Sequence, residues 1–262
     1  MEPILYGSQN SFGGEFIGAD TYCQLRAFNY SLSRIDAQEQ TADTAGLLAI
    51  EAQAAGLQPL VILKHPDQLA QLPDYSWVEP GNEPDLNGPK ATEYLIRALA
   101  FAGAANDTIQ LWAPCISNLT KTGFAYLRSV ASHLPARYHI SIHRYPRGPF
   151  PNLAHPGCQS REDEVAQLKA AIGGRPYGVS ECGFHTAMQP HYPDWRKNFR
   201  RWDIRLTDEQ VAAFYRIECA FWHRHGAQFV TLYQLADGPT DTPKDRAGIR
   251  RLDGSWKLCA QR

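Results

Sequence analysis

Short β-rich runs alternate with amphipathic helical stretches along the whole chain, and this alternation restricts the fold more than any other feature. A parallel strand that is buried on both faces needs a nearly continuous apolar run, and residues 59–63 form one. The strand-like runs span residues 4–6, 30–35, 59–63, 75–79, 108–113, 138–142, 177–180 and 229–233. Strands that alternate with helices are typical of an α/β fold with a parallel sheet.

The stretches between these runs carry helix signals. Residues 41–56 have apolar side chains at helical spacing and end at Gly56, a common helix stop. Thr207 and Gln210 form a capping-box pattern at the start of another helix. We expect helices at residues 19–28, 41–56, 66–72, 90–105, 123–134, 161–172 and 207–225. The tail after Gly254 is short, so an eighth helix must be brief or absent.

These elements predict an α/β fold, a single (β/α)8 TIM barrel over residues 1–262 with a short or missing eighth helix. The length of 262 residues is close to the roughly 250 that such a barrel needs, and no linker composition divides the chain. An open, doubly wound sheet is the alternative, because eight strands do not prove closure. It is less favoured, since no GxGxxG motif or P-loop follows an early strand.

Charge and hydropathy limit the partners that we expect. The 26 Lys and Arg nearly balance the 27 Asp and Glu, so no global field favours nucleic acid or an anionic membrane. No run approaches the roughly 20 apolar residues of a membrane span. The N-terminal residues do not resemble a secretion signal. We therefore expect a cytoplasmic protein, or a secreted mature form whose leader has been removed, and the sequence indicates no oligomeric state.

The six cysteines include no CxxC pair. They are Cys23, Cys115, Cys158, Cys182, Cys219 and Cys259. The even number is compatible with disulfides, but the spacing is typical of neither a disulfide scaffold nor a zinc site, so we expect unpaired buried thiols.

His139 and His143 share a strand face, but no third ligand stands at a suitable spacing. We expect no metal and no cofactor.

Polar and titratable side chains follow the predicted strands, which is where the active site of a barrel lies. Two of them are glutamates, Glu83 after the fourth strand and Glu181 after the seventh. The others are Arg34, His65, Asn82, His143, Tyr145, Tyr233 and Gln234. Two carboxyl groups at one barrel mouth are the minimum that hydrolysis of a glycosidic bond requires.

In this order, the residues make the chain similar to the clan A glycoside hydrolases, which are retaining enzymes on a (β/α)8 barrel. The residues that match the clan's strand-end motifs are Arg34, His65, Asn82, Glu83, His143, Tyr145 and Glu181. Residues 248–257 also resemble the end of such barrels. The resemblance covers nearly the whole chain, and its strength lies in five individually weak motifs that stand in the expected strand order.

The resemblance implies a retaining β-glycoside hydrolase that acts on an oligo- or polysaccharide. Glu181 is the expected nucleophile and Glu83 the expected acid/base. Arg34 and Tyr145 would favour the ionised form of Glu181 by charge attraction and hydrogen bonding. His143 would hydrogen-bond Glu83 or the substrate.

Further substrate contacts are expected around this pair. Asn82 is placed to hold the sugar 2-hydroxyl, and Trp195 lies in a long segment whose Trp residues could stack on sugar rings or pack on the barrel. The clan often has a Trp at the end of strand eight, where this chain has Tyr233 and Gln234 instead. Trp112 either compensates for that Trp or belongs to the core.

Three alternatives remain open at this point. Glu79 competes with Glu83 for the acid role, although it precedes the turn at Gly81 that can lift Glu83 over the barrel mouth. The absent strand-eight Trp is compatible with a carbohydrate-binding barrel that has lost catalysis. A barrel hydrolase of different, metal-assisted chemistry is the third reading.

Overall fold

Eight parallel strands form a closed barrel in which each strand pairs with its neighbours in sequence and β1 pairs with β8. This computed structural model describes residues 5–10, 19–87, 90–145, 154, 158–183, 206–233, 251, 255 and 257–260. The strands are β1 (Leu5–Asn10), β2 (Leu32–Asp36), β3 (Gln58–Leu63), β4 (Trp77–Pro80), β5 (Gln110–Trp112), β6 (Tyr138–Arg144), β7 (Tyr177–Gly183) and β8 (Ala227–Tyr233). The predicted (β/α)8 barrel is confirmed, and the open sheet is excluded.

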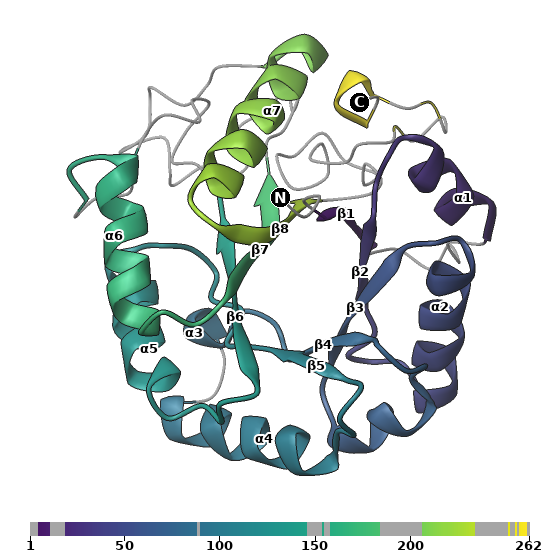
Figure 1. Ribbon diagram of the computed structural model, residues 1–262, viewed down its shortest axis with the longest axis vertical. Helices are drawn as coiled ribbons and strands as arrows, with labels where there is room; N and C mark the ends of the chain where they lie inside the picture. Colours follow the sequence, from purple (N-terminus) through teal and green to yellow (C-terminus); the bar gives the residue numbers. More distant parts are fainter. Residues whose placement is uncertain are drawn as a thin grey trace.

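Helices surround the ring of strands (Figure 1). They are α1 (Ala19–Ala27), α2 (Ala42–Ala54), α3 (Pro84–Asn87), α4 (Ala91–Ala104), α5 (Lys121–Ala131), α6 (Arg161–Ile172) and α7 (Asp208–Arg224). Among the described residues that follow β8, the one helical element is the 3-10 turn η3 (Leu258–Ala260), in agreement with a short eighth helix. No helix in the described part of the chain is both long and apolar enough to cross a membrane.

Local sequence explains most of these boundaries. The capping box at Thr207 is present, with Gln210 N donating to Thr207 Oγ1 at 3.3 Å and Thr207 N donating to Gln210 Oε1 at 2.8 Å. The expected third helix is instead the 3-10 helix η1 (Pro66–Gln71). Pro73 follows within two residues, and the short segment that remains favours a tight turn over a full α-helix.

The barrel interior has an apolar layer beneath a polar one. Leu32, Leu60, Trp112 and Phe229 are fully buried and pack together with Trp77. Trp112 therefore belongs to the core and does not form the floor of a sugar subsite.

Because side chains alternate along a strand, the inward-facing residue two positions after Leu32 on β2 is Arg34. By the same alternation, Glu79 follows Trp77 on β4. The apolar layer thus supports a charged layer near the ends of the strands.

The cysteines whose side chains are described are all unpaired, as expected. Cys115, Cys182 and Cys219 are buried, and Cys158 is partly buried. Cys23 is exposed on α1, where the prediction of a buried thiol is wrong.

Candidate active site

Arg34 lies at the centre of the charged layer. Its Nε donates to Glu79 Oε2 at 2.6 Å, and its Nη1 donates to Glu181 Oε1 at 2.6 Å. Its Nη2 donates to Asn82 Oδ1 at 2.8 Å. Burial opposes the charge, but the carboxylates of Glu79 and Glu181 outweigh burial and raise the pKa of Arg34 well above its usual value. A permanent positive charge therefore joins the ends of β2, β4 and β7.

A β-bulge between β6 and β7 brings His143 beside Glu181. Ile142 pairs with Val179, but the next residue, His143, pairs with Glu181, so Ser180 is an extra residue on β7. Without the bulge, the alternation of side chains would direct Glu181 away from the barrel interior. The bulge thus directs this carboxyl group into the site.

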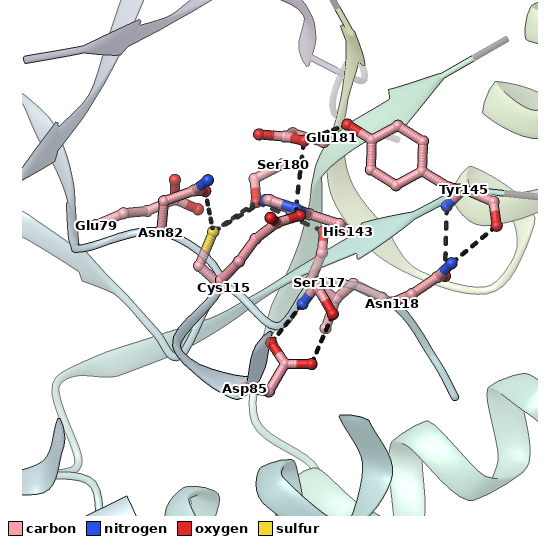
Figure 2. Close-up of polar contacts among 12 residues, drawn as sticks. Glu79, Asn82, Asp85, Cys115, Ser117, Asn118, His143, Tyr145, Ser180 and Glu181 are labelled. Atoms are coloured by element: carbon pink, nitrogen blue, oxygen red, sulfur yellow. Dashed lines mark hydrogen bonds and ion pairs between the residues drawn. The ribbon is translucent and has the colours of Figure 1, made fainter. Parts of the chain in front are cut away.

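His143 is fully buried and bridges Glu83 and Glu181, the two glutamates that the sequence singles out. Figure 2 shows it beside Glu181. Its Nδ1 lies 2.9 Å from Glu83 Oε1 and 3.3 Å from Glu181 Oε2. Burial alone would lower the pKa of His143, but Cys115 and Glu181 raise it well above its usual value. One oxygen of each glutamate and a ring nitrogen of His143 all lie within 4.8 Å of one another.

Glu83 reaches this cluster through an unusual backbone path at the end of β4. Gly81 has φ +95° and Glu83 has φ +45°, so both occupy the left-handed region. Glu83 N donates to the carbonyl oxygen of Cys115 at 3.1 Å, which fixes the turn on the loop after β5. The Glu83 side chain is 27% exposed, whereas that of Glu79 is 0% exposed and paired with Arg34. Glu83 is therefore the more accessible carboxyl group of the two.

Tyr145 provides a second donor to Glu181. Its hydroxyl donates a short hydrogen bond to Glu181 Oε2. Burial and the charge of Glu181 raise the pKa of the Tyr145 phenol well above its usual value, so the hydroxyl keeps its proton. Asn118 holds the backbone of Tyr145, since its Nδ2 donates to the Tyr145 carbonyl at 3.0 Å and its Oδ1 accepts from the Tyr145 amide at 3.3 Å.

Gly183 makes room for the Tyr145 ring. A Cβ at position 183 would lie 2.6 Å from Tyr145 Cε1, so we expect Gly183→Ala to displace the ring and weaken its bond to Glu181. A hydrogen bond to a charged group contributes about 1.5–3 kcal/mol. For a reaction that depends on Glu181, its loss predicts a fall of about tenfold to a hundredfold in kcat/KM. Gly103→Ala is the control, because a Cβ there meets nothing within 4 Å. Equal values of kcat/KM in Gly183→Ala and Gly103→Ala would contradict this role for Tyr145.

The remaining predicted residues lie further from the cluster or outside the described part of the chain. Tyr233 ends β8, and its ring packs at 5.7 Å from that of Tyr145. His65 follows β3, where its amide donates to Gln68 Oε1 at 2.8 Å. His65 also lines a hollow of about 390 Å³ between the loops after β2 and β3. Trp195 and Gln234 lie outside the described residues.

The sequence does not single out Cys115 as a site residue, although its sulfur contacts several members of the cluster. Its Sγ lies 3.0 Å from His143 Nε2 and 3.1 Å from Arg34 Nη2. The available signal was its place directly after the fifth strand, the position that drew attention to the other candidates. The spacing of the cysteines predicts only an unpaired buried thiol at this position.

No protein-family model matches the chain, and no curated protein sequence matches it. Solved structures do share the fold. A family 39 glycoside hydrolase from Bacteroides cellulosilyticus WH2 superimposes with a TM-score of 0.69 at 14% identity, over 98% of this chain and 62% of that one. A family 17 β-1,3-glucanosyltransferase from Rhizomucor miehei gives a TM-score of 0.65 at 14% identity, over 97% and 96%.

A third similar structure is the exo-β-1,4-mannosidase Op5Man5 from Opitutaceae bacterium strain TAV5. It gives a TM-score of 0.63 at 12% identity and covers 98% of this chain and 57% of that one. The chain thus spans about three fifths of the length of the family 39 enzyme and of the mannosidase. At these identities the similarity shows the fold alone, a (β/α)8 barrel.

Proposed function

We propose that this chain is a single catalytic domain that hydrolyses β-glycosides with retention of configuration. The observation that carries the proposal is the pair Glu83 and Glu181, which present oxygens within 4.8 Å of each other at the carboxyl ends of the barrel strands. Retaining glycosidases hold their two carboxyl groups about 5–5.5 Å apart, whereas inverting enzymes need roughly 6.5–9.5 Å to admit a water. The limit of 4.8 Å applies to the nearest oxygens of the pair and not to the centres of the carboxyl groups, and this close approach is the support for double displacement.

Glu181 is the proposed nucleophile. Its Oε1 accepts from Arg34 and its Oε2 accepts from Tyr145. Both contacts hold the carboxyl group in place for attack on the anomeric carbon. The same two donors stabilise the carboxylate when it leaves in the second step.

Glu83 is the proposed acid/base. The cluster contains three carboxyl groups, those of Glu79, Glu83 and Glu181, beside two cationic groups, those of Arg34 and His143. Arg34 holds Glu79 and Glu181, and Glu83 is the carboxyl group exposed toward solvent. It is therefore the group best placed to protonate a leaving sugar oxygen and then to activate water.

A β-linked oligo- or polysaccharide is the proposed substrate. The names of two structural neighbours, a β-1,3-glucanosyltransferase and an exo-β-1,4-mannosidase, refer to β-linkages. We propose that Asn82 holds the 2-hydroxyl of the reacting sugar, since it directly precedes Glu83 and its Oδ1 is fixed by Arg34 Nη2 at 2.8 Å. His65, Tyr233, Trp195 and Gln234 are proposed as further substrate contacts.

The test is a panel of aryl β-glycosides and β-glucans, with proton NMR of the first product formed. Retention predicts that the β-anomer appears first and then mutarotates. Initial α-anomer would exclude retention. Binding of oligosaccharide without cleavage would instead favour a barrel that has lost catalysis.

A metal-assisted hydrolase is the competing function, because Glu83, His143 and Glu181 offer atoms close enough to hold a cation. A metal would need an unprotonated His143, whereas the pKa of this ring is raised. Arg34 also places a positive charge 2.6 Å from Glu181. We therefore favour a hydrogen-bonded network. Activity that is lost in EDTA and restored by a divalent cation would favour the metal.

A further inference from the structure

We propose that Cys115 is a positioning residue of this site, whose thiol holds the His143 ring with Nδ1 turned toward Glu83 and Glu181. This inference rests on the proposed function, because it concerns the histidine that joins the two proposed catalytic glutamates. Its geometry, however, can be tested without any catalytic assay.

Cys115 is fixed by its backbone on both sides. Its amide donates to the Ser141 carbonyl on β6 at 3.0 Å, and its carbonyl accepts from the Glu83 amide at 3.1 Å. Its φ of +57° lies in the left-handed region, a conformation that persists in a non-glycine residue only where its surroundings impose it. The side chain is fully buried. The sulfur position is therefore set by the loop that also sets Glu83.

Four polar groups surround the sulfur, and Figure 2 labels His143, Asn82 and Ser180 among them. His143 Nε2 lies at 3.0 Å, Arg34 Nη2 at 3.1 Å, Asn82 Oδ1 at 3.5 Å and Ser180 Oγ at 3.6 Å. Burial raises the pKa of the Cys115 thiol, so the sulfur keeps its proton and can both donate and accept. Arg34 can only donate, which leaves the thiol proton for His143 or Asn82.

This arrangement satisfies His143 in both of its protonation states. When the ring is neutral, Nε2 accepts the thiol proton, and the ring's own proton stays on Nδ1, facing the carboxyl groups. When the ring is charged, Nε2–H donates to the sulfur, and the thiol proton turns to Asn82 Oδ1. In both states Nδ1 donates toward Glu83 and Glu181. A side chain without a polar atom provides neither contact.

The charged and titratable groups described around the ring come from the ends of β2, β4, β5, β6 and β7. Glu83 and Glu181 lie at Nδ1, Arg34 and Cys115 lie at Nε2, and the Tyr145 ring lies edge-on at 6.3 Å. Arg34 is the other neighbour described at Nε2, and as a cation it disfavours a second positive charge there. The thiol is therefore the contact at Nε2 that permits His143 to be charged.

The test follows the His143 ring by nitrogen NMR of histidine-labelled protein, in the wild type, Cys115→Ala and Cys115→Ser. In the wild type at high pH, we expect the neutral ring to carry its proton on Nδ1. A hydrogen bond to the charged ring is stronger than one to the neutral ring, so the loss of both in Cys115→Ala favours the neutral ring and should lower the titration midpoint by about one pH unit. Cys115→Ser, which keeps a donor and an acceptor, should restore it.

Glycoside hydrolysis provides the second readout, and Cys219→Ala is the control for Cys115→Ala. Cys219 is buried in α7, away from the cluster, so its substitution removes the same thiol from the hydrophobic core. We expect a loss of about tenfold in kcat/KM for Cys115→Ala, with recovery in the serine variant and no loss in the control. A wild-type ring protonated on Nε2 at high pH, or an unchanged midpoint in Cys115→Ala, would overturn the proposal. If no glycoside is cleaved, the NMR result still decides the role of Cys115.

Discussion

Glu181→Gln should abolish glycoside hydrolysis, with a fall in kcat of at least about 10⁴-fold, as is typical when a covalent nucleophile is removed. The amide cannot attack the anomeric carbon, yet its oxygen can still accept from Arg34 while its NH2 group donates to the Tyr145 hydroxyl, which can also accept. Arg34 also keeps its 2.6 Å ion pair with Glu79, so no buried charge loses its last partner. We therefore expect the fold to survive. The measurements are steady-state hydrolysis of an aryl β-glycoside and thermal unfolding.

Glu209→Gln is the matched control for this variant. Glu209 is an exposed residue in the first turn of α7, and the same change there should leave hydrolysis intact. Near-normal turnover by Glu181→Gln would contradict its role as nucleophile. Loss of activity together with a large fall in unfolding temperature would show that Glu181 acts through the fold instead.

The barrel and most of its site could be predicted because strand ends are visible in the sequence. Each predicted strand overlaps one observed strand, and the chain order of strands fixes which ends meet at the mouth. Glu181 follows a run that already reads as a strand, and Arg34 lies near the end of another. Sequence order alone therefore placed these side chains on one rim of the barrel.

The parts that escaped prediction depend on contacts between strands. The bulge that pairs His143 with Glu181 is a matter of register between β6 and β7, which neither strand encodes alone. The sequence leaves Glu79 as a rival acid, because its pairing with Arg34 becomes visible only when both side chains are known to point into the barrel interior. Cys115 was missed for the same reason, because its partners come from four other segments of the chain.

Glu83→Ala should slow hydrolysis in a way that depends on the leaving group. General acid–base catalysis contributes about 10²–10⁴-fold, so glycosides with poor leaving groups should lose that much in kcat/KM. An activated aryl group departs without a proton, so glycosylation of Glu181 should continue and the covalent intermediate should accumulate. The fold is expected to hold, since His143 Nδ1 retains Glu181 as a partner at 3.3 Å.

Azide separates the two glutamates by the stereochemistry of its product. In Glu83→Ala the covalent intermediate on Glu181 still forms, so azide should attack it from the opposite face, restore turnover and give the β-glycosyl azide. In Glu181→Ala no intermediate forms, and azide in the vacated space should displace the aryl group directly and give the α-glycosyl azide. Each configuration follows from the number of displacements at the anomeric carbon. Exchanged configurations would reverse the two roles, and a Glu79→Ala variant that gave the β-azide would transfer the acid role to Glu79.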